Sequence, residues 1–213
     1  MKLIGLFGGT FNPVHCGHLE LAGYAMEELD LAKVLFLPTA SPPHKPGYEI
    51  ASFEHRAEMI RLAINDDPRF SLLEIEAKIP APNYTIDTLS WLLQQEEHKR
   101  EYVFIIGIDA FLDIHLWKNH QEVLNTVHFI IAARSGHRKD ELLQCLKLIN
   151  YKEQDGHWYN SASLKEIYYL DCNIADVSSS EVRRKLAIGE STEKALPPVV
   201  MRYIVRHQLY RSK

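Results

Sequence analysis

Residues 8–18 read Gly8-Gly9-Thr10-Phe11-Asn12-Pro13-Val14-His15-Cys16-Gly17-His18, and they set the architecture that we expect for the whole chain. A short apolar run over 3–7 precedes them and a helix-like pattern over 19–29 follows, which predicts a glycine-rich turn between a buried strand and a helix. Such turns bind anions, because the first helical amides lack partners and the helix dipole is positive there. We expect Gly8 and Gly9 to be free to adopt positive φ and to let a ligand approach the backbone.

The two imidazoles of this stretch are three residues apart. If the helix begins near His15, then His15 and His18 project from its first turn toward the same anion. Imidazoles at this spacing can also share a metal ion, but no third ligand follows a zinc spacing and the chain has no H-E-x-x-H motif. We interpret Cys16, between them, as a small tolerated residue and not as a reactive thiol.

Length and composition favour a single domain over residues 1–213, with a helical C-terminal part from about residue 178. The net charge of −4 and the pI of about 6.3 argue against a protein that binds nucleic acid or a membrane surface through bulk positive charge. The three cysteines have no paired spacing, and the chain starts without a leader-like or long apolar segment. These features predict a reduced, cytoplasmic protein that neither enters a membrane nor binds nucleic acid.

Strand-like and helix-like segments alternate along the rest of the chain. Further strands are expected over 34–37, 70–75, 102–106, 127–132 and 167–170. This alternation predicts an α/β fold with a doubly wound, mostly parallel sheet covered by helices on both faces. The segment 151–163 reads either as a surface insertion or as a hairpin.

Two helices carry clear boundary signals. One is expected to be capped by Ser52 and to run to about Asn65, with Arg56 lying off its apolar stripe. The other opens at Ser178, where Glu181 three residues later matches the capping-box pattern, and Gly189 is a natural stop. A proline-rich loop over 39–47 lies before the first of these helices.

Candidate ligand-binding residues gather where strands are expected to end. Gly107 and Asp109 follow the strand over 102–106, and open α/β sheets place their ligand crevice at the carboxyl ends of strands. Neither a Walker phosphate loop nor the G-x-G-x-x-G pattern occurs. The chain instead offers separate cationic or neutral donors, which suits reactions at phosphorus, where charge is spread over oxygens and catalysis is mainly positioning and electrostatic stabilisation.

Two motifs near opposite ends of the chain resemble those of the nucleotidyltransferase superfamily. His15-Cys16-Gly17-His18 matches its H-x-G-H element, and residues 178–183 resemble its I-S-S-T-x-I-R motif, with Ser180 in place of threonine and Val177 in place of isoleucine. Within the superfamily, the chain resembles the bacterial nicotinate-nucleotide adenylyltransferases over nearly its whole length. The matching segments are 8–15, 42–45, 55–59, 83–89, 106–111 and 117–118.

This resemblance implies a Rossmann-like nucleotidyltransferase fold and a reaction in NAD biosynthesis. AMP would pass from ATP to nicotinate mononucleotide, giving deamido-NAD and pyrophosphate, with Mg²⁺ carried on the ATP phosphates. The partners would be these two small molecules, and a homo-oligomer is left open. The alternatives are an enzyme of the same fold acting on nicotinamide mononucleotide or phosphopantetheine, a nucleotide-binding sensor without turnover, and a metal-dependent hydrolase.

The resemblance also implies roles for individual residues. Four would be catalytic, namely His15, His18, Lys45 and Arg183. ATP would be bound from both ends of the chain by Gly8, Gly9, Thr10, Phe11, His15, His18, Gly107, Asp109, Ser179 and Arg183. Nicotinate mononucleotide would be bound by His44, Lys45, Tyr84, Thr85, Trp117 and Arg134.

Several of these roles have a specific chemistry. Tyr84 and Thr85 would offer main-chain amides to the nicotinate carboxylate, whereas a carboxamide would also need an acceptor. Trp117 would stack on the pyridine ring, although a tryptophan is more often a core residue. Asp109 would contact ribose hydroxyls, although it could be only a helix N-cap. The pair His44-Lys45 could equally be a solvated loop tip, and the sequence around Arg134 departs from the family pattern at Ser135 and His137.

Overall fold

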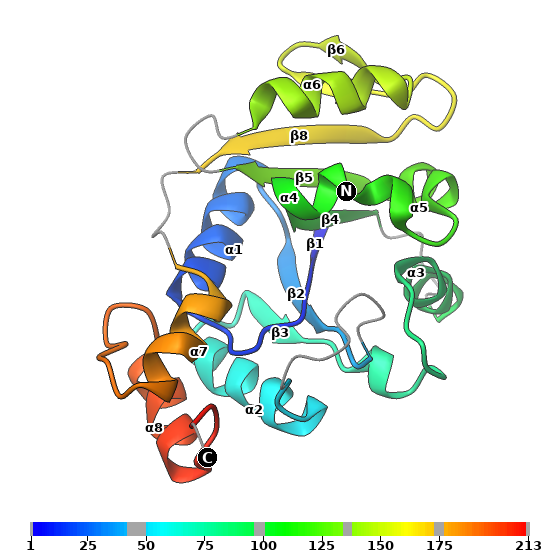
Figure 1. The fold of residues 1–213 in the computed structure, drawn as a ribbon. Helices are drawn as coiled ribbons and strands as arrows, with labels where there is room; N and C mark the ends of the chain where they lie inside the picture. The colour runs from blue at the N-terminus through cyan, green and yellow to red at the C-terminus, as the bar shows by residue number, and fades with distance from the viewer. Residues whose placement is uncertain (1, 42–49, 96–100, 134–137, 173–176, 212–213) are drawn as a thin grey trace.

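The computed structural model describes residues 2–41, 50–95, 101–133, 138–172 and 177–211. Their strands form one sheet in the order β3-β2-β1-β4-β5-β8-β7-β6 (Figure 1). The strands are β1 Ile4–Gly9, β2 Lys33–Pro38, β3 Phe70–Leu72, β4 Tyr102–Gly107, β5 His128–Ala133, β6 Lys152–Gln154, β7 His157–Tyr159 and β8 Glu166–Asp171. The strands from β3 to β8 in this order run parallel, whereas β7 and β6 form an antiparallel hairpin at one edge. The mostly parallel sheet is confirmed, and the segment 151–163 is the hairpin of the two options.

Helices connect the parallel strands and close the chain. They are α1 Cys16–Glu28, α2 Phe53–Ile64, α3 Thr85–Gln94, α4 Ile108–Leu112, α5 His120–Thr126, α6 Lys139–Leu148, α7 Ser179–Ala187 and α8 Pro198–Arg206. Two short 3₁₀ helices, η1 Ile75–Ala77 and η2 Ile114–Leu116, stand between them. The expected strand over 70–75 was therefore too long, because the chain leaves the sheet after Leu72 and turns into η1. None of the helices in the described ranges is both long and apolar enough to cross a membrane.

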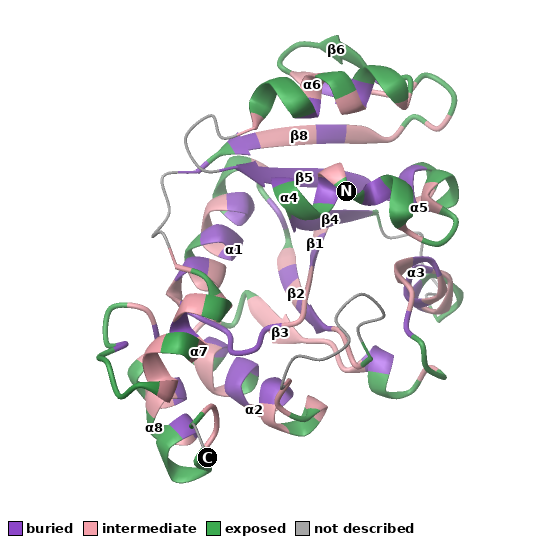
Figure 2. Cartoon of the chain, viewed as in Figure 1, coloured by how far each residue is buried: buried purple, intermediate pink, exposed green. Residues whose placement is uncertain are grey.

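Two apolar layers cover the sheet, one on each face. Alternate residues of β1 point to opposite faces, so that Phe7 packs with α1, α2, α7 and α8, whereas Leu6 packs with α3 to α6. Figure 1 shows these two groups of helices on opposite sides of the sheet. The central strands β4 and β5 are buried along almost their whole length (Figure 2), as expected of parallel strands between two helical layers.

The predicted caps are observed at the helix ends. The Ser52 hydroxyl accepts a hydrogen bond from the main-chain N–H of His55, and the Ser178 hydroxyl accepts one from that of Glu181. The Glu181 carboxylate accepts hydrogen bonds from Arg184, so the capping box is realised only in its first half. Gly189 adopts a φ of 74° directly after Ile188, the C-cap of α7, as a helix stop requires.

The strand order reverses between β1 and β4, since β2 and β3 lie on one side of β1 and β5 and β8 lie beyond β4. Open α/β sheets bind ligands at such a switch point, outside the carboxyl ends of the strands. The loop over residues 10–15 leaves β1 at this point. The fold thus places the His15–His18 segment where a nucleotide is expected.

Candidate active site

The two imidazoles come together at the start of α1. His15 is the N-cap of α1 and His18 is its third residue, and their rings stack with centroids 3.6 Å apart. His15 is 6 % exposed, and its main-chain N–H donates to Nδ1 of His18 at 3.2 Å. The structure therefore brings the two rings together in the first turn of the helix, as their spacing predicted.

His18 is held in one neutral form by this contact. Because its Nδ1 accepts a hydrogen bond, the ring proton of neutral His18 resides on Nε2. Burial, and then the proximity of His15, lower the pKa of His18 well below its usual value. At neutral pH, His18 thus offers an N–H donor and not a positive charge.

The glycines of the turn serve a different purpose from the one expected. Gly8 and Gly9 are the last residues of β1, and among the described glycines positive φ occurs only at Gly156 and Gly189. A Cβ on Gly8 would lie 2.5 Å from the ring of Phe104, and one on Gly9 would lie 3.2 Å from the ring of Phe11. The expectation of positive φ was wrong, because these positions need the space for two rings and not an unusual backbone.

The left-handed residue of the turn is Phe11, with a φ of 48°. Its side chain is buried, and its ring lies 4.9 Å from the ring of His18 in an edge-on arrangement. Phe11 therefore packs edge-on against the ring of His18, whereas Thr10 is half-buried next to it. The local backbone is fixed by packing of an aromatic side chain.

Helix α7 reaches the same loop from the far end of the sequence. Nη1 of Arg183 donates to the main-chain carbonyl of Asn12 at 2.8 Å, and Nη2 donates to the Ser180 hydroxyl at 3.2 Å. The Ser179 hydroxyl donates to the carbonyl of Pro13 at 2.9 Å. Figure 1 shows the loop after β1 passing beside α7. The two sequence motifs thus meet in space, with Arg183 bonded to the loop that leads into His15.

Asn12 and Tyr210 belong to this arrangement although the sequence gave neither a role. Asn12 is 4 % exposed, and its side-chain Oδ1 accepts hydrogen bonds from the main-chain N–H of Ala51 and from the Tyr210 hydroxyl, at 3.1 and 2.7 Å. The C-terminal segment after α8 therefore holds the loop through the side chain of Asn12, while Arg183 holds its main chain. A signal existed for Asn12, which lies inside the matched segment 8–15, but none existed for Tyr210.

A second set of candidates lies at the start of α3. Tyr84 is the N-cap of α3 and Thr85 its first residue, and Nζ of Lys118 lies 4.7 Å from the centre of the Tyr84 ring. Trp117 is half-buried and meets the ring of Phe104 edge-on at 6.1 Å. Tyr84 and the 117–118 segment are therefore neighbours. Phe104 connects them to β1, because the same ring fills the space above Gly8.

Asp109 lies in the first turn of α4 and is not the residue that caps this helix. Gly107, the last residue of β4, is the N-cap of α4, so the interpretation of Asp109 as an N-cap was wrong. Asp109 lies in the first turn, with its side chain 72 % exposed, and its Oδ1 forms an ion pair with Nη1 of Arg138 at 2.7 Å. Arg138 also binds Glu141, and these contacts raise the pKa of its guanidinium. The sequence gave no signal for the Arg138–Asp109 pair.

Three candidates fall outside the described residues. They are His44 and Lys45, within 42–49, and Arg134, within 134–137; Ser135 and His137 belong to the same second gap. The roles that the resemblance gives these residues stay predictions.

Comparisons with known proteins agree with this geometry. Residues 6–185 match the cytidylyltransferase-like family. The chain is 43% identical over 212 residues to a protein of Desulfotalea psychrophila named "Probable nicotinate-nucleotide adenylyltransferase", covering 99% of this chain and 100% of that protein. A protein of the same name from Pelobacter propionicus is 38% identical, with 97% of each chain covered.

A similar fold occurs in a solved structure. The nicotinic acid mononucleotide adenylyltransferase of Plasmodium falciparum, complexed with NaAD, superposes with a TM-score of 0.73 over 99% of this chain and 98% of its own, at 19% identity. This likeness supports the Rossmann-like architecture. The full-length identity to the two bacterial relatives identifies the group within the family. The chain belongs to the cytidylyltransferase-like family and, within it, to the nicotinate-nucleotide adenylyltransferases.

Proposed function

We propose that this enzyme transfers AMP from ATP to nicotinate mononucleotide, releasing pyrophosphate and deamido-NAD. The observation that carries the proposal is the meeting of Arg183 with the loop that leads into the stacked pair His15 and His18. A triphosphate lying on this loop would face the first turn of α1, two imidazoles and a guanidinium. Losing one well-placed donor of this kind typically costs about 100- to 1,000-fold in rate.

The reaction needs positioning more than proton transfer. An oxygen of the acceptor phosphate forms a bond to the α-phosphorus of ATP, while the bond from that phosphorus to the bridging oxygen breaks and its electron pair leaves with pyrophosphate. The ionised acceptor phosphate needs no base. Neutral His18 would donate its Nε2–H to a phosphate oxygen, and Arg183 would add a positive charge where negative charge accumulates.

Mg²⁺ fits this site as a companion of ATP. Among the described residues, no three His, Cys, Asp or Glu side chains lie close enough together to hold a metal ion. The donors around the loop after β1 suit phosphate oxygens instead. Mg²⁺ held by phosphates and water would neutralise part of the triphosphate charge.

The start of α3 suits an acidic acceptor. The amides at Tyr84 and Thr85 open the helix, and Lys118, which lies over the Tyr84 ring, is paired with Asp87 at 3.0 Å. Main-chain donors at a helix start favour a carboxylate over a carboxamide, which would also need an acceptor. Trp117 would stack on the pyridine ring, and His44, Lys45 and Arg134 would bind phosphate.

The adenosine side would use the end of β4. Gly107 would contact the nucleoside and Asp109 the ribose hydroxyls, and for the latter contact the Asp109 carboxylate keeps one oxygen beyond the pair with Arg138. A cytoplasmic location is part of the proposal, because the homologues carry the name of a biosynthetic enzyme. A homo-oligomer remains a prediction to be measured in solution.

The proposal is tested by pyrophosphate release from ATP with Mg²⁺. Nicotinate mononucleotide, nicotinamide mononucleotide and phosphopantetheine are supplied in parallel, and kcat/KM is compared. We expect the acid to be the best acceptor. Equal kcat/KM for the acid and the amide would overturn the acceptor assignment, and release of pyrophosphate without any acceptor would indicate a hydrolase.

A further inference from the structure

Arg56 is the most deeply buried charged side chain of the described core, at 1 % exposure. It lies in the first turns of α2, and within the described ranges every hydrogen bond of its guanidinium goes to a main-chain carbonyl. Nε donates to Ala51 at 2.9 Å, Nη1 donates to Thr10 and Thr39 at 2.8 Å each, and Nη2 donates to Ala40 at 3.4 Å. A buried cation needs such partners, and here they come from three separate segments of the chain.

Two of these carbonyls lie directly after neighbouring strands of the sheet. Thr10 directly follows β1, and Thr39 directly follows β2, the neighbouring parallel strand. The main-chain N–H of Thr39 also donates to the carbonyl of Gly9 at 2.9 Å. Arg56 therefore joins the two loops at the level where both strands end, at the base of the loop that carries His15.

A second buried side chain continues this connection. Glu76 of η1 is 6 % exposed, and its carboxylate accepts the N–H of Ala40 and the hydroxyl of Thr88, both at 3.1 Å. Ala40 is thus held through its carbonyl by Arg56 and through its N–H by Glu76. Thr88 belongs to α3, the helix that begins at Tyr84 and Thr85. Contacts between buried polar groups therefore run without a break from the loop after β1 to the helix proposed to bind the acceptor.

We propose that Arg56 is a positioning residue for the transfer reaction, which fixes the loop after β1 relative to the acceptor-binding end of α3. This inference rests on the proposed function, because it assigns ATP to the loop and the acceptor to α3. In-line attack depends on the separation of the two substrates, and a displacement of about 1 Å caused by a remote change can cost about 100-fold in rate. Arginine suits this task because its planar guanidinium donates in several fixed directions, whereas a lysine is a single flexible ammonium.

The experiment compares Arg56→Lys with Arg61→Lys. Arg61 lies on the same helix, but its side chain is half exposed and pairs on the surface with Glu58 and Glu74. For R56K we expect kcat per folded molecule to fall about 10- to 100-fold, with KM for both substrates within about threefold of the wild type. For R61K we expect both parameters to stay at the wild-type values.

The split between kcat and KM separates positioning from a structural role. If Arg56 only stabilises the fold, R56K lowers the melting temperature while kcat per folded molecule stays unchanged, and that result overturns the inference. A loss confined to KM for ATP overturns it as well, because it would make Arg56 part of ATP binding. The folded fraction is measured by circular dichroism at the assay temperature.

A second variant covers the case that R56K does not fold. Glu76→Gln keeps Arg56 and the shape of the side chain, but it removes the charge and one of the two acceptor oxygens that hold Ala40 and Thr88. We expect a smaller fall in kcat, about three- to tenfold, again without a change in KM. An unchanged kcat in folded E76Q overturns the inference. Turnover of the wild type is measured first, so that failure of the proposed function is recognised before any variant is interpreted.

Discussion

The parallel strands start at one side of the sheet, the amino edge, and end at the other, the carboxyl edge. Each of these edges holds a histidine whose Nδ1 accepts a main-chain hydrogen bond, but the electrostatic surroundings are opposite. At the amino edge, His128 opens β5 and its Nδ1 accepts the main-chain N–H of Glu166 at 3.1 Å. At the carboxyl edge, Nδ1 of His18 accepts the N–H of His15 at 3.2 Å. Burial lowers the pKa of both rings. The hydrogen bonds alone would not tell a structural histidine from a functional one.

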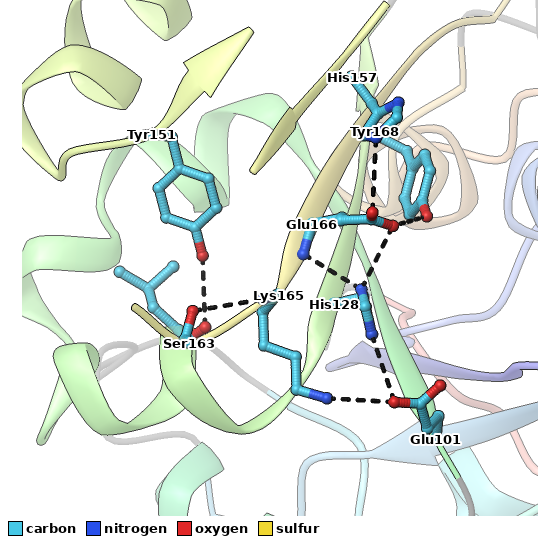
Figure 3. A network of polar contacts seen from close by, with 9 residues as sticks. Glu101, His128, Tyr151, His157, Ser163, Lys165, Glu166 and Tyr168 are labelled. Carbon is cyan, nitrogen blue, oxygen red and sulfur yellow. Dashed lines mark hydrogen bonds and ion pairs between the residues drawn. The ribbon is translucent and has the colours of Figure 1, made fainter. Parts of the chain in front are cut away.

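Charged side chains surround His128 (Figure 3), although within the described ranges its buried Nε2 has no hydrogen-bond partner. Nε2 of His128 lies 4.0 Å from a carboxylate oxygen of Glu101, and Nδ1 lies 3.8 Å from one of Glu166. Lys165 lies 3.6 Å from the same Glu101, and His157 lies 3.5 Å from Glu166. Two carboxylates and one lysine surround His128, so negative charge predominates at this edge, which disfavours an anionic ligand.

The surroundings of His18 are different. Its ring contacts the rings of His15, Phe7 and Phe11, and within the described ranges neither His18 nor Arg183 forms an ion pair. A second imidazole disfavours charge on His18, whereas the negative charge of a phosphate would favour it. The comparison teaches that the charge around a histidine donor, and not its burial alone, distinguishes the edge at which we propose that the substrate binds.

The largest effect is expected when the two histidines are removed in turn. His18→Ala should lower kcat by at least about 100-fold, or about 2.7 kcal/mol of transition-state stabilisation. His128→Ala should lower the melting temperature but leave kcat per folded molecule within about twofold of the wild type. Steady-state pyrophosphate release, corrected for the folded fraction, gives both values. Near-normal turnover of folded H18A would abolish the distinction between the two edges.

The next effect concerns β1, which runs from one edge to the other. Gly8→Ala should destabilise the protein by about 1–3 kcal/mol, because the new Cβ would lie 2.5 Å from the ring of Phe104. At Gly5, nearer the amino edge, the nearest atoms are 3.0 Å away and belong to flexible aliphatic side chains, so Gly5→Ala should cost less. Urea denaturation measures both variants. Restored stability in Gly8→Ala combined with Phe104→Leu would identify the ring as the cause, whereas equal costs at Gly5 and Gly8 would contradict it.

Sequence reasoning succeeded where local chemistry decides the structure. The spacing of His15 and His18, the cap at Ser178 and the stop at Gly189 follow from contacts within a few residues. Even the approach of Arg183 to the first loop was foreseen, but only because two motifs of one family were recognised at opposite ends of the chain. The alternating pattern of apolar segments was enough for the parallel sheet.

It failed where the partners are distant in sequence. Arg56 lies off the apolar stripe of α2, a position that normally faces water, and only the carbonyls of Thr10, Thr39 and Ala40 explain its burial. Gly8 is a glycine because a ring on another strand lies above it. Such reasons depend on which loops the finished fold brings together, and no pattern along one segment contains them.

A smaller effect follows from the lowered pKa values of His18 and His128. In the unfolded chain both histidines take up a proton near pH 6.5, whereas in the folded protein each does so only at lower pH. The unfolded state therefore binds more protons below about pH 6.5. The free energy of unfolding should decrease as the pH is lowered, by at most about 1.4 kcal/mol per pH unit for each ring. Denaturation curves between pH 5 and 8, about the range in which histidines titrate, measure this slope.

Single substitutions assign the slope to the two edges. His18→Asn should flatten it more than His128→Asn, because the nearby carboxylates of Glu101 and Glu166 counteract the effect of burial on the pKa of His128. Saturating ATP should also flatten the slope in the wild type, since phosphate would raise the pKa of His18, but it should leave the contribution of His128 unchanged. An identical slope in both variants would contradict the electrostatic contrast.

The smallest effect is expected at Tyr210, which links the chain terminus to the carboxyl edge. Tyr210→Phe removes one hydroxyl, and the Asn12 oxygen keeps the N–H of Ala51 as its other donor, so we expect a loss of about 0.5–1.5 kcal/mol in unfolding free energy. Tyr203→Phe on α8 is the matched control, because its hydroxyl lies 2.9 Å from Nδ1 of His55. Of the two variants, only Y210F should also lower kcat, by about two- to fivefold, since Tyr210 contacts the loop that leads into His15 and Tyr203 contacts His55 instead. A fall in stability without a fall in kcat would mean that the loop keeps its place without the C-terminal segment, and that the contacts of Arg183 and Arg56 suffice to hold it.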